Sequence, residues 1–168
     1  MPLFRLRPAV DADANAIAEL YYASYRLLTF LPRLHTLDSY RWFVANRMLK
    51  ECAVTVAEDE TGIVGFIALQ EQKVRHRQAN IPGLWLYVRP DRIGCGAGTQ
   101  LIEDAKASGV ASIELRCFQA NARARRFYEA RGFRAIGFTD GRDNEERTPD
   151  VLFRWERRAN GDTDPPAE

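Results

Sequence analysis

The sequence predicts a mixed α/β (α+β) domain: one central, mostly antiparallel sheet of six to seven strands, with about four helices on its two faces. In the first half, short apolar runs are separated by glycine-containing turns, which indicates antiparallel hairpins. In the second half, strand-like and helix-like runs alternate, which indicates strand–helix–strand crossovers. The 168 residues fit a single domain, placed at 1–158, and the polar segment 159–168 with its two prolines is expected to be a disordered tail.

Each element follows from the spacing of apolar residues and from the turn residues between them. Either Asp11 or Asp13 can cap the first helix, and Gly132 fits the left-handed position after the last one. Residues 84–88 are apolar throughout, which predicts a strand buried on both faces. Residues 70–80 are polar and predict a loop or the frayed end of a hairpin. In chain order the expected elements are a strand at 3–7, a helix ending at 26, a helix at 37–50, strands at 53–57, 63–69 and 84–88, a helix at 99–107, a strand at 111–117, a helix at 121–131, and strands at 133–138 and 151–155.

The composition excludes several classes of function. The formal net charge of +1 gives no electrostatic basis for nucleic-acid binding. No apolar run approaches the roughly 20 residues that span a bilayer, and the N-terminus lacks an apolar signal core, so we expect a cytoplasmic protein without a membrane partner. The cysteines, Cys52, Cys95 and Cys117, are odd in number and contain no C-x-x-C pair, so we expect neither a disulfide framework nor a metal site.

A glycine-rich turn lies between the apolar strand and the helix that follows it. Residues 88–99 read VRPDRIGCGAGT and space Gly94, Gly96 and Gly98 at alternate positions. A helix N-terminus exposes unpaired N–H groups, and glycines let that backbone approach a phosphate or pyrophosphate closely. A P-loop would require Lys-Ser/Thr after the last glycine, and a dinucleotide fingerprint would space the glycines as G-x-G-x-x-G. The spacing alone also allows a tight connection with no ligand.

Two motifs give the turn a more specific context. Together they resemble the coenzyme-A-binding motifs of GNAT-type N-acetyltransferases over about residues 84–137. The chain departs from the family pattern before the first glycine, where Gln or Arg is usual: Ile93 stands there, with Arg92 one place earlier. The first motif comprises Leu86, Tyr87, Val88, Pro90, Gly94, Gly96, Gly98, Leu101 and Ile102, and the second Asn121, Ala124, Phe127, Tyr128, Glu129, Gly132 and Phe133.

The resemblance implies a GNAT-like acyl-CoA N-acyltransferase fold and acetyl-CoA (coenzyme A) as co-substrate. The pantetheine arm is then expected between the strands at 84–88 and 113–117, paired with the backbone of Leu86 and Val88. A backbone N–H near Leu86 or Tyr87 would stabilise the developing oxyanion. The residues that the resemblance implies at coenzyme A are Leu86, Tyr87, Val88, Ile93, Gly94, Cys95, Gly96, Ala97, Gly98, Thr99, Asn121 and Tyr128.

Tyr128 is the expected catalytic residue. Acyl transfer to an amine requires a neutral amine, a stabilised oxyanion and a proton for the departing thiolate. A tyrosine with an ordinary pKa of about 10 stays protonated at neutral pH and can donate to that thiolate. Asn121, at the start of the same helix, would bond the pantetheine amides. Taken alone, Tyr128 fits a core aromatic beside Phe127 better than a catalytic residue, and the full second motif reverses that preference.

No general base follows from the sequence. Many family members place a Glu on the strand equivalent to 84–88, and this chain has none there. Glu71, His35 or a chain of water molecules stay open as proton acceptors, and positioning alone would suffice for an amine of low pKa. We interpret Cys95 as filling a variable position of the turn, because no histidine or acid lies near it in the sequence.

The region where the family usually places its acceptor is aromatic and charged. The linker 27–35 is flanked by Tyr21, Tyr22, Tyr25 and Trp42, and the loop 140–147 carries both charge signs. An apolar pocket with an acidic rim would suit an amine-bearing small molecule or a peptide N-terminus. Alternatively, these aromatics only pack the helices on the sheet. A homodimer is a possible assembly.

Two other classes of function stay open at this point. A non-catalytic acyl-CoA sensor that acts through a protein partner would tolerate Ile93 and the missing strand Glu, whereas Asn121 and Tyr128 favour an enzyme. A nucleotide-binding protein could use the same glycine turn. Stabilisation by ATP but not by coenzyme A would identify the latter.

Overall fold

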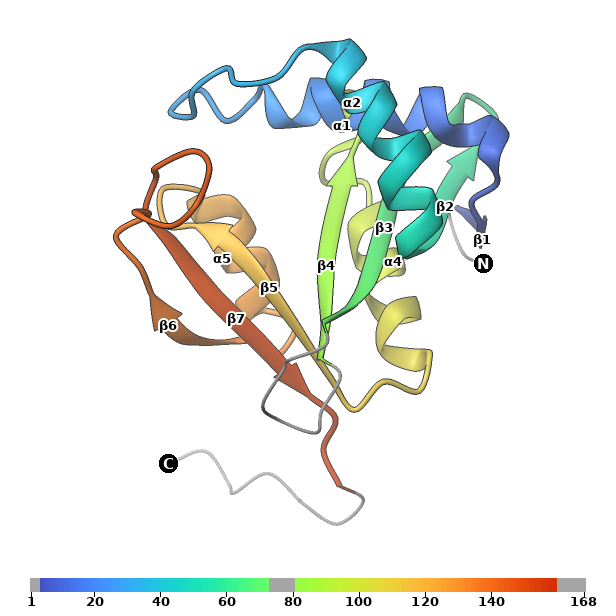
Figure 1. Cartoon of the computed structure of the whole chain (residues 1–168). Coiled ribbons are helices and arrows are strands. Elements are labelled where there is room, and N and C mark those ends of the chain that lie inside the picture. The colour runs from blue at the N-terminus through green and yellow to red at the C-terminus, as the bar shows by residue number, and fades with distance from the viewer. Residues whose placement is uncertain (1–3, 73–80, 160–168) are drawn as a thin grey trace.

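The structure, a computed structural model, describes residues 4–72 and 81–159, and only the backbone of residues 71, 72, 81 and 82. Within these residues seven strands form one sheet in the order β1-β2-β3-β4-β5-β7-β6 (Figure 1). Only β4 and β5 pair in parallel, and the other neighbours are antiparallel. The strands are β1 (Arg5–Pro8), β2 (Ala53–Asp59), β3 (Gly62–Gln72), β4 (Ile81–Val88), β5 (Ser112–Phe118), β6 (Arg134–Phe138) and β7 (Asp150–Glu156).

Four principal helices cover the sheet, and the mixed, mostly antiparallel architecture predicted from the sequence is confirmed. Helices α1 and α2 lie over one face and α4 and α5 over the other (Figure 1). None of the helices in the described part of the chain is long and apolar enough to cross a membrane. The helices are α1 (Ala14–Tyr25), α2 (Leu37–Phe43), the short α3 (Leu49–Glu51), α4 (Ala97–Ala107) and α5 (Ala122–Glu129), with a 3-10 turn at Pro90–Arg92.

The observed boundaries differ from the expected ones in a few places. The predicted helix 37–50 is continuous from α2 to α3 but contains one wide π-helical turn at Val44–Met48, whose first and last side chains are buried. Strand β3 extends to Gln72, so the start of the predicted polar loop is paired backbone. Leu3, residues 73–80 and most of the predicted tail lie outside the described residues.

The prediction that strand 84–88 is buried on both faces is wrong. All five residues are only half-buried. The reason is the pairing of β4, which meets β5 at the single position Gly83↔Glu114 and then separates from it, whereas β5 stays paired with β7 along 112–118 (Figure 1). An apolar run therefore marks a strand that lines open space as well as core.

Alternation along β4 connects the two cores of the molecule. Leu84, Leu86 and Val88 pack toward the cluster formed with α4, β5 and β7, which contains the fully buried Phe153. Trp85 and Tyr87 pack toward the cluster under α1 and α2. Because side chains of a strand point alternately to opposite faces, β4 presents different chemistry on its two sides.

The start of α1 is tied to β1 by one carboxylate. Asp13 occupies the N-cap position, but instead of capping the helix its side chain accepts two bonds from the Arg7 guanidinium, at 2.7 and 3.0 Å, and one from the Val10 N–H at 2.8 Å. The Arg7 hydrogen bonds are the main reason that the pKa of Asp13 is lowered. Asp11, the other predicted cap, pairs with Lys50 at the surface, 3.0 Å away.

Replacing Asp13 by Asn should destabilise the fold by about 1–3 kcal/mol at pH 7, because a half-buried guanidinium loses one of its two charged acceptors and keeps only Glu58. A carboxyl whose pKa is depressed in the folded state stabilises the protein above its unfolded pKa of about 3.9 and loses that contribution as the pH falls further. Urea unfolding should therefore show the difference at pH 7 and a smaller one at pH 3. The exposed Asp11→Asn variant is the control, with an expected loss below about 1 kcal/mol.

Candidate active site

The glycine turn forms the start of α4 in a conformation that needs glycine at two positions. Gly94 and Gly96 have φ of 87° and 96°, in the left-handed region, and Gly96 is the N-cap residue of α4. Gly98 has no such φ, but a Cβ there would lie 3.4 Å from the Phe127 ring of α5. The first N–H groups of α4 lack helical acceptors, so the turn can bind an anion through its backbone.

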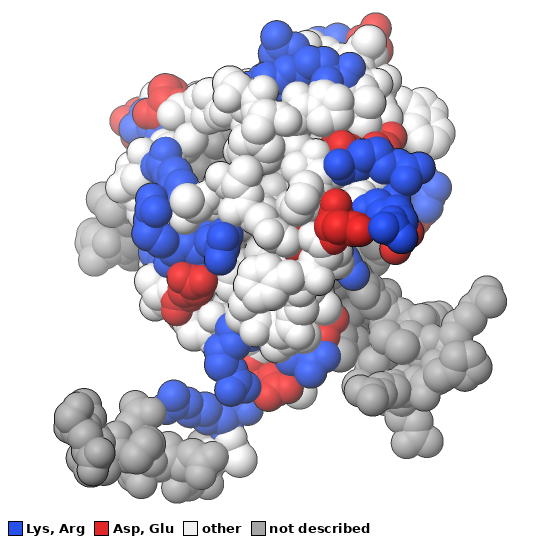
Figure 2. Space-filling model, turned by 90° about the vertical axis from the view of Figure 1, so that its left-hand side faces the viewer, with Lys and Arg blue, Asp and Glu red and all other residues white. Residues whose placement is uncertain are grey.

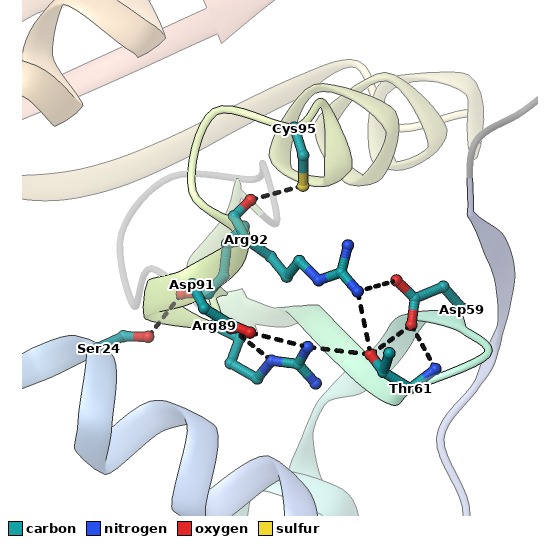
Figure 3. A network of polar contacts seen from close by, with 8 residues as sticks. Ser24, Asp59, Thr61, Arg89, Asp91, Arg92 and Cys95 are labelled. Carbon is teal, nitrogen blue, oxygen red and sulfur yellow. Dashed lines mark hydrogen bonds and ion pairs between the residues drawn. The ribbon is translucent and has the colours of Figure 1, made fainter.

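A polar network fastens the outer side of this turn to the β2–β3 hairpin (Figure 3). Arg92 lies 3.1 Å from a carboxylate oxygen of Asp59, whose other oxygen accepts the Thr61 N–H and hydroxyl at 2.7 and 2.6 Å. These Thr61 hydrogen bonds are the main cause of the lowered pKa of Asp59. Arg89 donates to Thr61 as well, at 3.0 Å. Arg92 is therefore turned toward Asp59, and its side chain does not replace the Gln or Arg that the family pattern has at Ile93.

Two residues of the turn point their side chains inward. Cys95 donates its thiol to the carbonyl of Arg92 at 2.6 Å and packs against the core (Figure 3). Ala97 is almost fully buried. The Cys95 N–H also donates to the Arg92 carbonyl, at 3.3 Å, so Cys95 is a structural residue of the turn, as interpreted from the sequence. Ala97, at the start of α4, can offer its backbone N–H to a ligand.

A groove of about 540 Å³ runs from the turn along β4 and α5. It brings together most of the predicted coenzyme A residues, with the side chains of Cys95 and Ala97 as the exceptions. Two arginines that sequence reasoning missed, Arg123 and Arg131, also line it. Their spacing around Phe127, four residues on either side, was the available signal. The other lining residues include Leu86, Tyr87, Val88, Ile93, Gly94, Gly96, Gly98, Thr99, Asn121, Ala124 and Tyr128.

Arg131 joins α5 to α4 across this groove. Its guanidinium lies over the Phe127 ring, 3.7 Å from the centroid, and donates to the Phe127 carbonyl at 2.8 Å. It also donates to the hydroxyl of Thr99 in the first turn of α4. A positive charge is thus fixed beside the turn by three contacts.

The backbone of β4 offers free hydrogen-bonding groups to a cleft between β4 and β5. The Arg89 N–H donates to the Val64 carbonyl at 2.7 Å. Together with the register of β3 and β4, this hydrogen bond identifies which residues of β4 bond to β3. By the alternation of an antiparallel ladder, Leu86 and Val88 then direct their N–H and C=O groups away from β3, whereas Tyr87 bonds to it. Ser24 of α1 donates to the Val88 carbonyl at 2.6 Å. Of the two oxyanion donors considered, Leu86 and not Tyr87 has an available N–H.

Tyr128 lies where the cleft meets the groove and lines both. Its ring packs against Phe127 and Phe133, and burial raises the pKa of its phenol. Among the hydrogen bonds between described side chains, none uses its hydroxyl. The phenol therefore stays protonated and faces open space.

Asn121 has a structural role in addition to the predicted one. It is the N-cap of α5, and its side-chain oxygen accepts the Ala124 N–H at 3.2 Å. Only its NH₂ group remains for a ligand in the cleft.

A third cavity, of about 700 Å³, opens on the α1–α2 side of β4. Of the predicted acceptor residues, Tyr21, Tyr25 and Trp42 line it, and Tyr22 instead packs between Tyr40 and Arg26. The aromatics both pack the helices and form a cavity, so the two alternatives are not exclusive. Three further aromatic residues of the cavity, Tyr40, Phe43 and Trp85, were not predicted as acceptor residues. The remaining lining residues are His35, Thr36, Asp38, Ser39, Glu145 and Glu146.

The acidic rim comes from the β6–β7 loop and the start of α2. His35, one of the open candidates for a base, lies 2.7 Å from the exposed Glu145. The side chain of Glu71, the other one, is not described. No group of three or more His, Cys, Asp or Glu side chains in the described segments could hold a metal ion. Seen from the side on which α5 and β6 lie in Figure 1, basic and acidic groups flank an uncharged band (Figure 2).

Comparisons with known proteins agree with this geometry. Residues 50–135, just over half of the chain, match the family model of the acetyltransferase (GNAT) domain. No curated protein sequence matches significantly.

Three solved structures illustrate the shared fold, and identities this low support the fold alone. The structure of yncA from Salmonella typhimurium, which contains its cofactor acetyl-CoA, is 21% identical, with a TM-score of 0.69 over 96% of this chain and 98% of that one. The ribosomal-protein-alanine N-acetyltransferase of Brucella melitensis is 23% identical, with a TM-score of 0.69 over 91% and 99%. An N-acetyltransferase of Staphylococcus aureus Mu50 is 17% identical, with a TM-score of 0.68 over 91% and 98%.

Replacing Asp59 by Asn should loosen the glycine turn without unfolding the protein, because Arg92 loses its charged partner. We expect hydrogen exchange of the amides at 93–98 to become several-fold faster, with little change in the midpoint of global unfolding. Asp91→Asn, which removes only the local partner of Arg89, is the matched control. Equal exchange rates in wild type and D59N would show that the network does not order the turn.

Proposed function

The chain belongs to the GNAT acetyltransferase family, and from this premise we propose that it transfers the acetyl group of acetyl-CoA to a primary amine of a small molecule or peptide by direct attack, with both substrates bound at once. One observation carries the proposal: the cleft between β4 and β5 joins the other two cavities. Leu86, Asn121 and Tyr128 line both cleft and groove, whereas Tyr25 and Trp85 line both cleft and aromatic cavity. A donor and an acceptor can therefore meet between the strands.

The groove fits coenzyme A in shape and charge. The N–H groups at the start of α4 would hold the pyrophosphate. The family pattern has Gln or Arg at the position of Ile93, and Arg131, fixed beside the turn, would supply a guanidinium in place of that missing side chain. Arg123 also faces the groove and would serve the same phosphates. The free C=O of Leu86 and the free N–H of Val88 would pair with the pantetheine amides, so that the arm lies like an added strand.

The residues around the cleft supply the chemistry that acyl transfer needs. Acetyl-CoA brings an activated thioester when bound. The N–H of Leu86 is available to stabilise negative charge on the carbonyl oxygen of the acetyl group. Tyr128 would donate its proton to the thiolate, because its burial keeps the phenol neutral.

The same groove would serve a non-catalytic acyl-CoA sensor, the alternative function. The aromatic cavity that joins the cleft favours the enzyme, since a sensor needs no second substrate site. A thiol-release screen with acetyl-CoA over amines, amino acids, polyamines and peptides would separate the two, because a sensor binds acetyl-CoA and releases no thiol with any of them.

Gly96 provides the test of donor binding. Gly96→Asp and Gly96→Asn add side chains of the same size at a left-handed φ, so both should weaken acetyl-CoA binding through backbone strain. Only Asp also places a carboxylate beside the pyrophosphate. Isothermal titration should show an affinity for G96D at least tenfold below that of G96N, a difference of about 1.4 kcal/mol. Undiminished affinity in G96D would rule out this turn as the binding site, and thermal stabilisation by ATP rather than coenzyme A would indicate a nucleotide-binding protein.

Tyr128 provides the test of catalysis. Tyr128→Phe keeps the ring in the core and removes the only proton that the residue can donate. We expect kcat to fall by about 10²-fold, the lower range for a general acid, while the Kd of acetyl-CoA changes less than about twofold. Steady-state kinetics together with calorimetry would measure both. Unchanged turnover would mean that water or another group protonates the thiolate.

A further inference from the structure

We propose that Glu146 binds the ammonium group of the acceptor and takes its proton, and that the acceptor is a small cationic amine with an apolar body and no neighbouring carboxylate. This inference rests on the proposed acetyl transfer and deepens it. It identifies the general base that the sequence does not reveal and narrows the class of substrate.

The position of Glu146 is the first argument. The residue lies in the β6–β7 loop, far in sequence from the other site residues, and is half-buried. It lines both the cleft between β4 and β5 and the aromatic cavity. Glu145 and Asp38 line only the aromatic cavity. Among the carboxylates of the acidic rim, Glu146 is therefore the one that lies where the aromatic cavity meets the cleft, beside the path of an amine that attacks a thioester there.

The pairing of the rim carboxylates is the second argument. Glu145 is bound to His35, and Asp38 pairs with Arg41 at 2.9 Å. Glu146 accepts one hydrogen bond, from the Tyr25 hydroxyl at 2.8 Å. Within the described part of the chain no Lys, Arg or His nitrogen forms an ion pair with it. A carboxylate held in place by a phenol and lacking a cation beside it provides a site for an ammonium group.

Aromatic rings surround this carboxylate and suit a cation. Tyr21 and Tyr40 pack edge to face with centroids 4.8 Å apart, and Tyr25 and Tyr40 lie 6.2 Å apart. Trp42 and Trp85 complete the wall. Ring faces attract an ammonium group and bind an apolar body at the same time.

The phenols of this wall cannot act as bases themselves. Burial, with the Glu146 charge as a further cause, raises the pKa of Tyr40 to about 12 and moves the pKa of Tyr21 and Tyr25 upward as well. The charge of Glu145 also raises the pKa of Tyr40, whereas the Arg33 guanidinium lowers it. At neutral pH the wall is therefore uncharged, and the groups that can take a proton there are His35 and the carboxylates.

Charge then selects among amines. Glu145, Glu146 and Asp38 would repel the carboxylate of an amino acid bound with its amine at the cleft. The nearby cations are engaged elsewhere, since Arg41 pairs with Asp38 and Glu19, and Arg33 donates to the Arg26 carbonyl at 2.8 Å. A cavity of about 700 Å³ has room for a small aromatic or aliphatic body.

The proton step balances without a further reactant. One N–H bond of the ammonium breaks and an O–H bond forms on Glu146, which leaves a neutral amine with a free electron pair. That pair attacks the acetyl carbon, and the C–S bond breaks. The leaving thiolate takes the Tyr128 proton, a second N–H proton of the attacking nitrogen restores the Tyr128 phenol, and the protonated Glu146 returns its proton to solvent. The titratable groups that line the aromatic cavity with Glu146 are Tyr21 and Tyr25 of α1, Asp38 and Tyr40 of α2, His35 of the linker, and Glu145 of its own loop. In the cleft the charged groups that line it with Glu146 are Glu114 and Arg116 of β5.

The experiment compares two acceptors of similar size. Phenethylamine is a cation at pH 7, whereas phenylhydrazine is mainly neutral and needs no base. In Glu146→Gln the kcat/KM for phenethylamine should fall at least tenfold at pH 7, and that for phenylhydrazine should change less than threefold. The loss for phenethylamine should shrink toward the high pH at which the amine deprotonates unaided. In the wild type, the kcat/KM for phenethylamine should be at least tenfold higher than that for phenylalanine.

Controls separate this inference from the proposed function. Asp143→Asn removes a charge from an exposed position of the same loop that lines none of the three cavities, and it should leave both kcat/KM values within twofold. The affinity of E146Q for acetyl-CoA should equal that of the wild type, which shows that the variant is folded. Equal losses with both acceptors, a preference for phenylalanine, or acetylation of peptides only would overturn the inference while leaving acetyl transfer intact. A wild type that acetylates no amine would overturn both.

Discussion

The separation of β4 from β5 after one paired position is the constraint on which the rest of the site depends. The N–H and C=O groups of a strand inside a sheet normally form hydrogen bonds with both neighbouring strands. Here Leu86 keeps its N–H and C=O, and Val88 keeps its N–H, unpaired toward β5, at a cost that a bound extended ligand would offset. The Val88 carbonyl accepts the Ser24 hydroxyl instead. The same divergence gives the cleft between the two strands, and every other feature of the site opens into it. Without the gap, Tyr128 would be a core tyrosine and the glycine turn an isolated anion site.

The two halves of the sheet hold the edges of the gap by different means. The β4 side is anchored through Ser24, which donates to the Val88 carbonyl, and through the network of Arg92 and Asp59. On the other side, α5 carries Tyr128 and is capped by Asn121, and Arg131 joins it to α4. A ligand in the groove contacts both sides, so its affinity depends on contacts that lie outside the groove itself.

Local patterns predicted the fold class and most of the residues that the groove brings together, because both depend on short segments of sequence. The glycine turn, the order of the strands and the helix of Tyr128 all follow from spacing within about twenty residues. The half-burial of β4 did not follow, since an apolar run does not show whether its neighbour is a strand or open space. Arg92 was ambiguous for a related reason: its partner, Asp59, is 33 positions away and belongs to another hairpin. Glu146 lies in a loop of mixed charge, and only tertiary contacts distinguish it from Glu145: its hydrogen bond with Tyr25, 121 positions away in the chain, and its place beside the cleft.

The net charge of +1 conceals a separation of charge that matters more than its sum. Arg123, Arg131 and the positive end of α4 gather at the groove, while Glu145, Glu146 and Asp38 gather at the aromatic cavity. Between them the cleft is lined largely by uncharged residues. Under the proposed function this arrangement sorts the substrates, because an anionic donor is attracted to one end and a cationic acceptor to the other. It also favours the chemistry, since an ammonium group that gives up its proton to Glu146 leaves the acidic end as a neutral amine, which is the only form that can attack between the strands.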